Sequence, residues 1–413
     1  MRIMAAAIEA VDPYQAVQTH LPQMEGPVYG LGIGKAAIPM LDALVERAPV
    51  AGGLAVTKFA AGFHRDVYAV MEGGHPVPDV RSLQAGERVL EFVSSLKEDD
   101  TLVCLISGGG SALVTAPYVP LKDLQTLTSM LLASGARIDE INTLRRQLDR
   151  IKGGGLARAT RARIISLILS DVVGSPLEAI ASGPTAPDPS TREDAWNILR
   201  KYELEQQIPG SITDILLPAP FPKSLTAELN SADGRGSIHG HVQNIIIGDN
   251  KRAAQAALEQ AQGEGFHVDI LSTELQGEAR EVGRELAQRL RAQHPELPHP
   301  FCLIIGGETT VTIQGNGKGG RNQELALAAV DELSGVKDVT LIALATDGDD
   351  GPTDAAGAVV TGETAQRAQL LGLDVGNYLS RNDAYHFFEA LGDLLKTGPT
   401  GTNVNDLIFL FAT

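Results

Sequence analysis

The sequence of 413 residues has few cysteines and no long apolar run. Its two cysteines, Cys104 and Cys302, each lie in an apolar run typical of a buried strand, which argues against a disulfide framework and for a reducing compartment. No apolar run approaches the roughly 20 residues that a membrane-spanning helix needs. The first residues also lack the pattern of a signal peptide. We therefore expect a cytoplasmic protein without a membrane partner.

Basic residues are also in deficit, with 34 Lys and Arg against 51 Asp and Glu and a net charge of −17. Nucleic acids and anionic membrane surfaces require basic footprints, so we expect neither as a partner. If the ligand is an anion, its site must be locally basic. Each Lys or Arg inside a glycine-rich loop is therefore informative.

The composition and length indicate a globular protein of two domains. Hydrophobic residues make up 43% of the chain, which is typical of a packed protein, and 413 residues exceed one ordinary core. Residues 201–240 lose regular periodicity and contain several prolines. We place the boundary near 235, which predicts an N-terminal Rossmann-like α/β domain at 1–235 and a C-terminal α/β domain at 236–413.

Residues 302–324 contain an apolar strand followed by a glycine-rich loop and a helix. Glycine allows a close approach to backbone N–H groups, and a helix N-terminus adds partial positive charge. Lys318 and Arg321 lie in or next to the loop, so we predict an anion-binding loop. A hairpin with an unstructured glycine loop is the alternative.

Two similar loops precede this one. The first follows a strand near residue 30 and carries Gly34 and Lys35 at a helix start, where a lysine opposes the helix dipole. It is neither a Walker A loop nor a GxGxxG fingerprint, because Ala36 and Ala37 replace the required residues. The second follows the apolar strand TLVCLI and consists of Ser107, three glycines and Ser111. Ligands of open α/β sheets bind at the carboxyl ends of strands, so both loops are candidate sites.

Several single residues are also candidates. Asp171 follows an apolar strand and could act as a base, a metal ligand or a helix cap. Clustered aspartates at 347–354 suit Mg²⁺, with an Asx-rich turn as the alternative. His75 is either a ligand contact or a turn residue, and Lys152 stands beside three glycines. The arginines of the predicted helix 136–151, at positions 145, 146 and 150, are expected to face solvent.

Taken together, these segments resemble a known family. GLGIGKAA, EGGHPVPD, LISGGGSALV, RIKGGGLA, SDVVGSPLEAIASGPTAPD, GGETTVTIQGNGKGGRNQE and DGDDGPTDAAGA occur in order from about residue 25 to the end. They are similar to the glycerate 2-kinase family, whose C-terminal part is called the MOFRL domain. Two positions depart from its pattern: Ser175 stands where Asp is usual, and residues 147–149 replace His-Leu-Ser.

The resemblance implies ATP- and Mg²⁺-dependent phosphorylation of D-glycerate at its 2-hydroxyl, giving 2-phosphoglycerate. It implies two α/β domains with largely parallel sheets and an interdomain cleft. The expected partners are D-glycerate and ATP, and a homodimer is an open alternative for the assembly. Family members are also often labelled hydroxypyruvate reductase, so an NAD(P)H-dependent reductase is the rival activity, although the missing GxGxxG argues against it. A sensor that binds a phosphorylated ligand without catalysis is a second rival.

These arguments lead to a set of predicted site residues. In the resembled family, the residues matching Lys35 and Arg321 are the active-site pair, so we expect Arg321 to face Lys35 across the cleft. Asp171 is the candidate that orients or deprotonates the 2-hydroxyl, with Glu308 or Asp347 as substitutes. Asp347 and Asp350 are the predicted Mg²⁺ ligands. The predicted nucleotide- and substrate-binding residues are Gly34, His75, Ser107, Gly108, Gly109, Gly110, Ser111, Lys152, Glu308, Gly319, Gly320 and Asn322.

Overall fold

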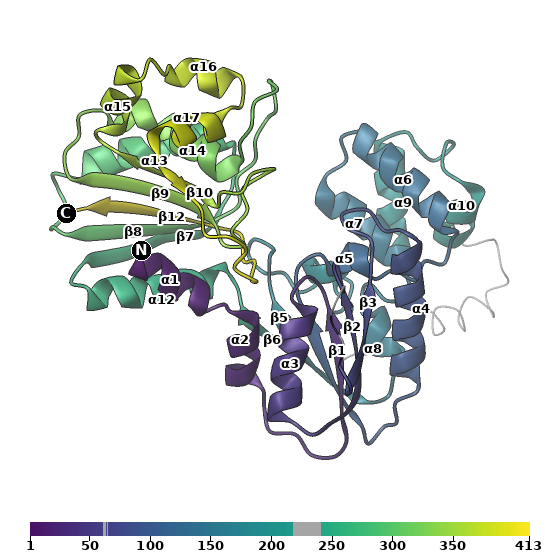
Figure 1. Ribbon diagram of the computed structural model, residues 1–413. Helices are drawn as coiled ribbons and strands as arrows, with labels where there is room; N and C mark the ends of the chain where they lie inside the picture. Colours follow the sequence, from purple (N-terminus) through teal and green to yellow (C-terminus); the bar gives the residue numbers. More distant parts are fainter. Residues whose placement is uncertain (61–62, 64, 218–240) are drawn as a thin grey trace. The chain divides into compact units, whose positions relative to one another are not determined.

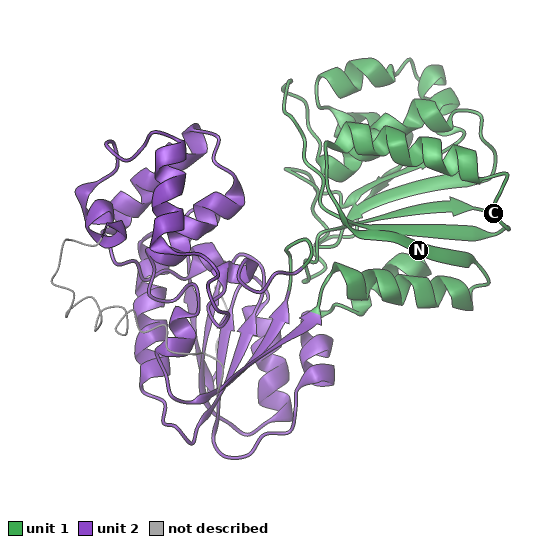
Figure 2. Cartoon of the chain, turned by 180° about the vertical axis from the view of Figure 1, so that it is seen from behind, with its two compact units in different colours: residues 1–12, 170–174, 248–413 green, residues 13–169, 175–247 purple. Residues whose placement is uncertain are grey.

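The computed structural model describes residues 1–60, 63, 65–217 and 241–413. These residues form two compact units (Figure 2). Unit 1 comprises residues 1–12, 170–174 and 248–413, and unit 2 comprises residues 13–169 and 175–247. The domain boundary expected near residue 235 lies outside the described residues. Residues 1–12 and 170–174, which we expected in the N-terminal domain, belong to the unit that holds the C-terminal part of the chain.

Unit 2 is built on a six-stranded sheet with the order β3-β2-β1-β4-β5-β6. Every pairing from β3 to β5 is parallel, as the continuous apolar strands predict. Strand β4 is buried along its whole length and lies in the middle of this sheet. The strands are β1 (Val28–Ile33), β2 (Val50–Thr57), β3 (Tyr68–Glu72), β4 (Thr101–Ile106), β5 (Arg163–Leu169) and β6 (Val242–Gly248).

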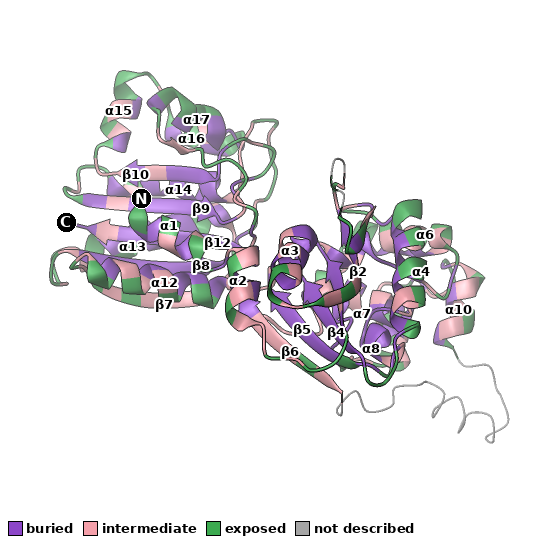
Figure 3. Ribbon diagram, turned by 60° about the horizontal axis from the view of Figure 1, so that its bottom comes forward, coloured by how far each residue is buried: buried purple, intermediate pink, exposed green. Residues whose placement is uncertain are grey.

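The helices of unit 2 fall into two groups. Helices α3 and α4 pack against the strands, and strands form much of the buried part of the unit in Figure 3. Helices α6, α7, α9 and α10 enclose a separate apolar cluster. The elements are α2 (Pro13–His20), α3 (Ala37–Arg47), α4 (Val80–Ser94), α5 (Gly110–Leu113), α6 (Leu121–Ala133), α7 (Ile138–Gln147), α8 (Gly155–Arg158), the 3₁₀ turn η1 (Ile180–Ser182), α9 (Arg192–Lys201) and α10 (Gly210–Leu216).

Unit 1 contains a second six-stranded sheet, with the order β11-β10-β9-β12-β8-β7. Only the β7–β8 pairing is parallel, and the other four pairings are antiparallel. Because β12 lies between β8 and β9, four of the six strands still run in one direction, with β10 and β12 opposed. The strands are β7 (His267–Leu275), β8 (Phe301–Gly307), β9 (Val339–Ala345), β10 (Gly357–Thr361), β11 (Leu394–Leu395) and β12 (Asp406–Ala412). The predicted α/β class and the largely parallel strand directions are confirmed.

Helices cover both faces of this second sheet (Figure 1). Helices α13 to α17 lie on one face and contribute to the main core of the unit. The first helix, α1, packs against α12 on the other face because Ile3, Met4 and Ala7 form a buried stripe. The helices are α1 (Arg2–Glu9), α12 (Asn250–Gly263), α13 (Ala279–Gln293), α14 (Arg321–Leu333), α15 (Thr364–Leu370), α16 (Val375–Ser380) and α17 (Ala384–Leu391). No helix in the described ranges has the length and apolar character that a membrane crossing requires.

Of the three arginines that we expected to face solvent, Arg150 is the most accessible, with 38% of its side chain exposed. Arg146 is buried and paired with Asp188, whose carboxylate lies 2.9 Å from its Nε. Arg145 is partly exposed but largely desolvated, while Arg150 pairs with Glu87. Helix α7 packs against α9, and its buried residues include Arg146 as well as Ile141 and Leu144.

Candidate active site

In unit 2, the two glycine-rich loops predicted from the sequence lie together at the ends of β1 and β4. These strands are parallel neighbours in register, with Ile33 opposite Ile106, so their following loops meet. The amide of Lys35 donates to the carbonyl of Gly108 at 3.0 Å, and the amide of Ala36 donates to Ser107 Oγ at 3.0 Å. The structure thus joins Lys35 and the loop beginning at Ser107.

Gly34 makes this close approach possible. Its φ is +128°, and a Cβ at this position would overlap Ser107. Both constraints favour glycine, because other residues rarely adopt such a φ and would push the two loops apart.

The loop after β4 presents free backbone donors. Gly109 adopts a left-handed conformation, with φ of 82°, and α5 begins at Gly110. Among the residues that the structure describes, none accepts a hydrogen bond from the amides of Gly109, Gly110 or Ser111. Unpartnered amides of this kind are the groups that hold phosphate oxygens in glycine-rich turns.

Lys35 and His75 lie against this loop. A Cβ built on Gly109 would lie 3.1 Å from His75 Cδ2 and 3.5 Å from Lys35 Cγ. Burial, followed by the charges of Lys35 and Lys58, holds the pKa of His75 below its usual value. This shift favours the neutral imidazole, which can donate from one ring nitrogen. Lys35 is exposed.

The opposite side of the loop is formed by a strained turn. Ala181 and Ser182 have φ values of 50° and 60°, which are rare for residues other than glycine and cost free energy. This conformation places Ser182 Oγ 2.8 Å from Ser111 Oγ. In such a pair one hydroxyl donates, so the other keeps its proton for a ligand. Ser182 was not among the predicted site residues.

Lys152 is buried beside the same loop. Its Nζ lies 2.8 Å from Asp149 Oδ2 and 3.1 Å from the carbonyl of Val114, so two of its three donors are used. Its side chain is only 3% exposed. Asp149 was not among the predicted site residues, and the i to i+3 spacing to Lys152 was the available signal.

In unit 1, Arg321 lies in a network of acidic side chains. Asp406 accepts from its Nε at 2.6 Å and from its second terminal nitrogen at 3.0 Å, and Glu308 accepts from the first at 2.7 Å. Burial by itself would lower the pKa of Arg321. The hydrogen bonds to Asp406 and the negative charge of Asp406 outweigh burial and hold the pKa of Arg321 above its usual value. The side chain is 32% exposed and retains two N–H donors.

Asn405 connects this network to Asp171. Its Nδ2 donates to Glu308 Oε2 at 3.1 Å and to the backbone carbonyl of Asp171 at 2.8 Å. The structure therefore gathers the predicted residues Asp171, Glu308 and Arg321, and adds Asn405 and Asp406. We missed both additions because the last strand appeared to be only a closing element.

The glycine-rich loop before α14, predicted as an anion-binding loop, uses several of its amides within unit 1. The amides of Gln314 and Gly315 donate to Asn382 Oδ1, and the amide of Gly317 donates to the carbonyl of Arg381. The amide of Lys318 donates to Asp383 Oδ1 at 3.0 Å. These four donors are already used within unit 1, so they cannot hold phosphate without rearrangement. The hairpin alternative does not form either, because this stretch makes only an isolated bridge at Thr310.

Asp350 and Asn322 have structural contacts at the start of α14. Asp350 is 1% exposed, and its two carboxylate oxygens accept from the amides of Asn322 and Gln323 at 3.1 and 2.8 Å. A Cβ on Gly320 would overlap this carboxylate, which explains the glycine there. Asn322 is also 1% exposed. Both side chains are thus buried at the start of this helix, and their predicted roles in metal binding and ligand binding stay predictions.

Asp347 remains the more accessible of the two predicted metal ligands. It is partly exposed, and its Oδ1 accepts from the amide of Asp349 at 3.2 Å. Within the described part of the chain, no three His, Cys, Asp or Glu side chains are grouped so that they could hold a metal ion by themselves. This arrangement fits Mg²⁺ only if phosphate oxygens and water supply most of its ligands.

Comparisons with known proteins assign the chain to one family. The family described as a domain of unknown function (DUF4147) matches residues 1–217, and the MOFRL family matches residues 301–406. D-glycerate 2-kinase of Thermotoga maritima is 43% identical over 99% of this chain and 96% of its own length. The chain belongs to the glycerate kinase family.

Two further comparisons concern the fold and the names used within the family. The crystal structure of glycerate kinase from Thermotoga maritima has a TM-score of 0.90 and 42% identity to this chain, covering all of it and 98% of the other. A protein of Agrobacterium vitis with the provisional name hydroxypyruvate reductase is 39% identical over 98% of this chain and 92% of its own length. The glycerate kinase family therefore includes members under both names.

Proposed function

We propose that this protein is an ATP-dependent glycerate 2-kinase that converts D-glycerate to 2-phosphoglycerate. The observation that carries the proposal is the set of free amides at Gly109, Gly110 and Ser111 beside Lys35. Phosphoryl transfer depends mainly on positioning and on neutralising the negative charge of the phosphates. Free amides and a lysine supply both in a chain that is otherwise strongly acidic.

The chemical step forms a bond between the 2-oxygen of D-glycerate and the γ-phosphorus of ATP. The bond from that phosphorus to the β–γ bridging oxygen breaks, and ADP leaves. In our proposal Asp171 orients the 2-hydroxyl and accepts its proton, and the network of Glu308 and Asn405 positions the Asp171 segment. Lys35 and Arg321 both serve the transfer by stabilising its negative charge.

Mg²⁺ belongs to the proposal as the ion that accompanies ATP. When bound, it would neutralise charge on the β- and γ-phosphates. Asp347 is our candidate to hold it, because its carboxylate is partly exposed whereas that of Asp350 is buried. A cytoplasmic location is also proposed, since both cysteines are unpaired and buried.

The decisive assay mixes the protein with ATP, Mg²⁺ and either D- or L-glycerate and identifies the product by ³¹P NMR. We expect 2-phosphoglycerate from the D-isomer. Lys35→Ala and Arg321→Ala should each lower kcat by at least about 100-fold, the scale measured when a donor to transition-state charge is removed. The matched controls are Lys122→Ala and Arg289→Ala, which change exposed residues of unit 2 and unit 1. Near-wild-type turnover in both active-site variants would contradict the assignment.

The second candidate function is reduction of hydroxypyruvate with NADH or NADPH, which the name of the Agrobacterium vitis relative favours. The loop at Gly34 speaks against it, because Ala37 occupies the third glycine position of a dinucleotide fingerprint. Loss of nicotinamide absorbance on addition of hydroxypyruvate, with no ADP formed from glycerate, would favour this rival.

A further inference from the structure

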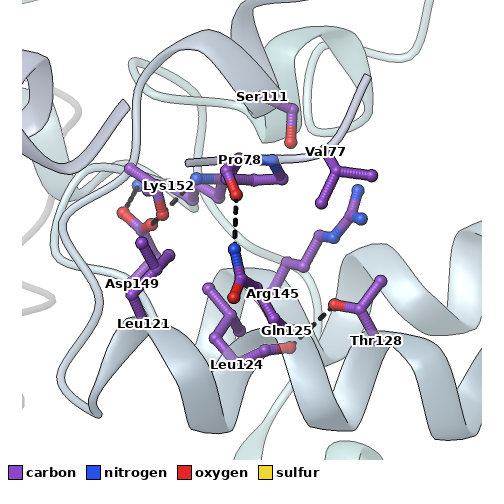
Figure 4. Close-up of a pocket in the computed structure, with 11 residues that line it drawn as sticks. Val77, Pro78, Ser111, Leu121, Leu124, Gln125, Thr128, Arg145, Asp149 and Lys152 are labelled. Carbon is purple, nitrogen blue, oxygen red and sulfur yellow. Dashed lines mark hydrogen bonds and ion pairs between the residues drawn. The ribbon is translucent and has the colours of Figure 1, made fainter. Parts of the chain in front are cut away.

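A small pocket lies within unit 2, next to the loop that carries the free amides (Figure 4). Its walls come from α6, the end of α7, and the segment around Pro78. Leu121 and Leu124 give it an apolar side. Ser111 lines one part of it, so the pocket and the proposed phosphate-binding loop share this residue.

Most polar groups of the pocket are used within the protein. Gln125 Nε2 donates to the carbonyl of Pro78 at 2.9 Å, and Thr128 Oγ1 donates to the carbonyl of Leu124 at 2.9 Å. Thr115 Oγ1 donates to Asp149 Oδ2 at 2.5 Å. These groups therefore already have partners within the protein.

Arg145 differs from them. Its guanidinium lines the pocket, yet it has no hydrogen bond or ion pair with any residue that the structure describes. Arg145 is only partly exposed, and burial holds the pKa of its guanidinium below the usual value. A desolvated cation without a counterion costs free energy, and an anionic ligand would remove that cost.

The charge balance of the pocket points the same way. Lys152 and Arg145 contribute two positive charges, and Asp149 contributes one negative charge. Asp149 accepts from Lys152 at 2.8 Å, so the charge of Arg145 is the one left without a partner. Arg321 in unit 1 is in the opposite situation, because Glu308 and Asp406 already balance it.

We propose that Arg145 binds the carboxylate of the acceptor hydroxy acid, with Lys152 and the Ser111 hydroxyl completing the pocket. The planar fork of arginine matches a carboxylate bidentately. A 2-hydroxy acid carries its hydroxyl on the carbon next to the carboxylate, so this binding fixes the position of the hydroxyl relative to Arg145. The inference rests on the proposed kinase function and assigns Arg145 as the residue that selects acids over neutral alcohols.

The test compares Arg145→Met, Arg145→Lys and the control Arg200→Met, which changes an exposed arginine of α9. Removing a hydrogen-bonded charge should raise KM for D-glycerate by about 10- to 100-fold in Arg145→Met, while KM for ATP and the far-UV circular dichroism stay unchanged. Arg145→Lys should fall between Arg145→Met and the wild type. The control should match the wild type.

A neutral acceptor provides a readout that a folding defect would not change. D-glyceramide has an amide in place of the carboxylate, so the wild type should prefer D-glycerate by kcat/KM and Arg145→Met should lose most of that preference. An unchanged preference, or an increase in KM for ATP instead of glycerate, would overturn the assignment.

Failure of the kinase proposal can be recognised separately. If the wild type forms no ADP with any hydroxy acid, the kinase function fails. Calorimetric titration with sodium D-glycerate then tests the pocket alone: weaker binding by Arg145→Met than by the wild type supports it, and equal binding by both refutes it.

Discussion

The buried pair of Asp149 and Lys152 gives a quantitative prediction for unit 2. Both side chains are almost fully buried, with 2% and 3% exposed. Asp149 also accepts from the hydroxyl of Thr115 and from the amides of Ala116 and Ile151, at 2.5, 3.1 and 2.8 Å. Removing one partner of such a pair leaves an uncompensated buried charge. We expect Asp149→Asn to lower the free energy of unfolding by about 3 to 5 kcal/mol at pH 7.

The assay is urea denaturation followed by tryptophan fluorescence. The chain has a single tryptophan, Trp196, which is partly buried against the apolar cluster that includes Leu144 and Leu148 of unit 2. Its fluorescence therefore reports unfolding of the unit that contains the buried pair. The surface control is Glu91→Gln, since Glu91 and its partner Arg88 are 70% and 51% exposed and such pairs contribute less than about 1 kcal/mol.

The double variant Asp149→Asn/Lys152→Met separates loss of the charge pair from other damage. Removing both charges should recover about half or more of the lost stability, because no unpaired charge remains buried. A single variant within about 1 kcal/mol of the wild type, or a double variant no more stable than the single one, would refute the reasoning.

The pH dependence of the single variant adds a check. Burial holds the pKa of Lys152 below its usual value, and Asp149 opposes this shift. Without Asp149 the pKa of Lys152 in the folded state falls further. Between this pKa and the pKa of Lys152 in the unfolded state, the folded state binds fewer protons than the unfolded state. Stability then rises with pH. The loss of stability in Asp149→Asn relative to the wild type should therefore become smaller as the pH increases from 7 to 10.

Two other substitutions test the close approach of the loops in unit 2 and the buried carboxyl group of Asp350 in unit 1. Gly34→Ala forces a Cβ into Ser107 at a φ of +128° and should cost about 2 to 5 kcal/mol in the same urea assay. Gly210→Ala, where no atom lies within 4 Å of the added carbon, should change little. Burial raises the pKa of Asp350 to about 7. Between the ordinary carboxyl pKa and this raised value, the folded state keeps a proton that the unfolded state has lost. The contribution of Asp350 to stability therefore falls as the pH rises toward 7. The stability advantage of the wild type over Asp350→Asn, measured by circular dichroism, should therefore be larger at pH 5 than at pH 8; an advantage that grows with pH would contradict the raised pKa.

Local patterns in the sequence were sufficient to predict the loops of unit 2. A buried apolar strand that ends in Ser107 and three glycines predicts a loop at the carboxyl edge of a parallel sheet. The conformations of Gly34 and Gly109 follow from the same local chemistry, since glycine readily adopts positive φ. The order of these motifs also sufficed to recognise the family, which the comparisons confirmed.

The partners of charged residues were decided only by the tertiary structure. Arg321 and Asp406 are 85 positions apart in the chain, and they meet because β12 runs antiparallel between β8 and β9, which brings its first residue to the edge where those strands end. The glycine-rich loop before α14 looked free in the sequence, but residues 381–383 supply acceptors for its amides. Arg145 and Arg146 are adjacent and chemically identical, yet Asp188 pairs with one and leaves the other facing a pocket. Residue spacing sets local backbone geometry, whereas the packing of distant segments determines which charges are paired and which remain available to a ligand.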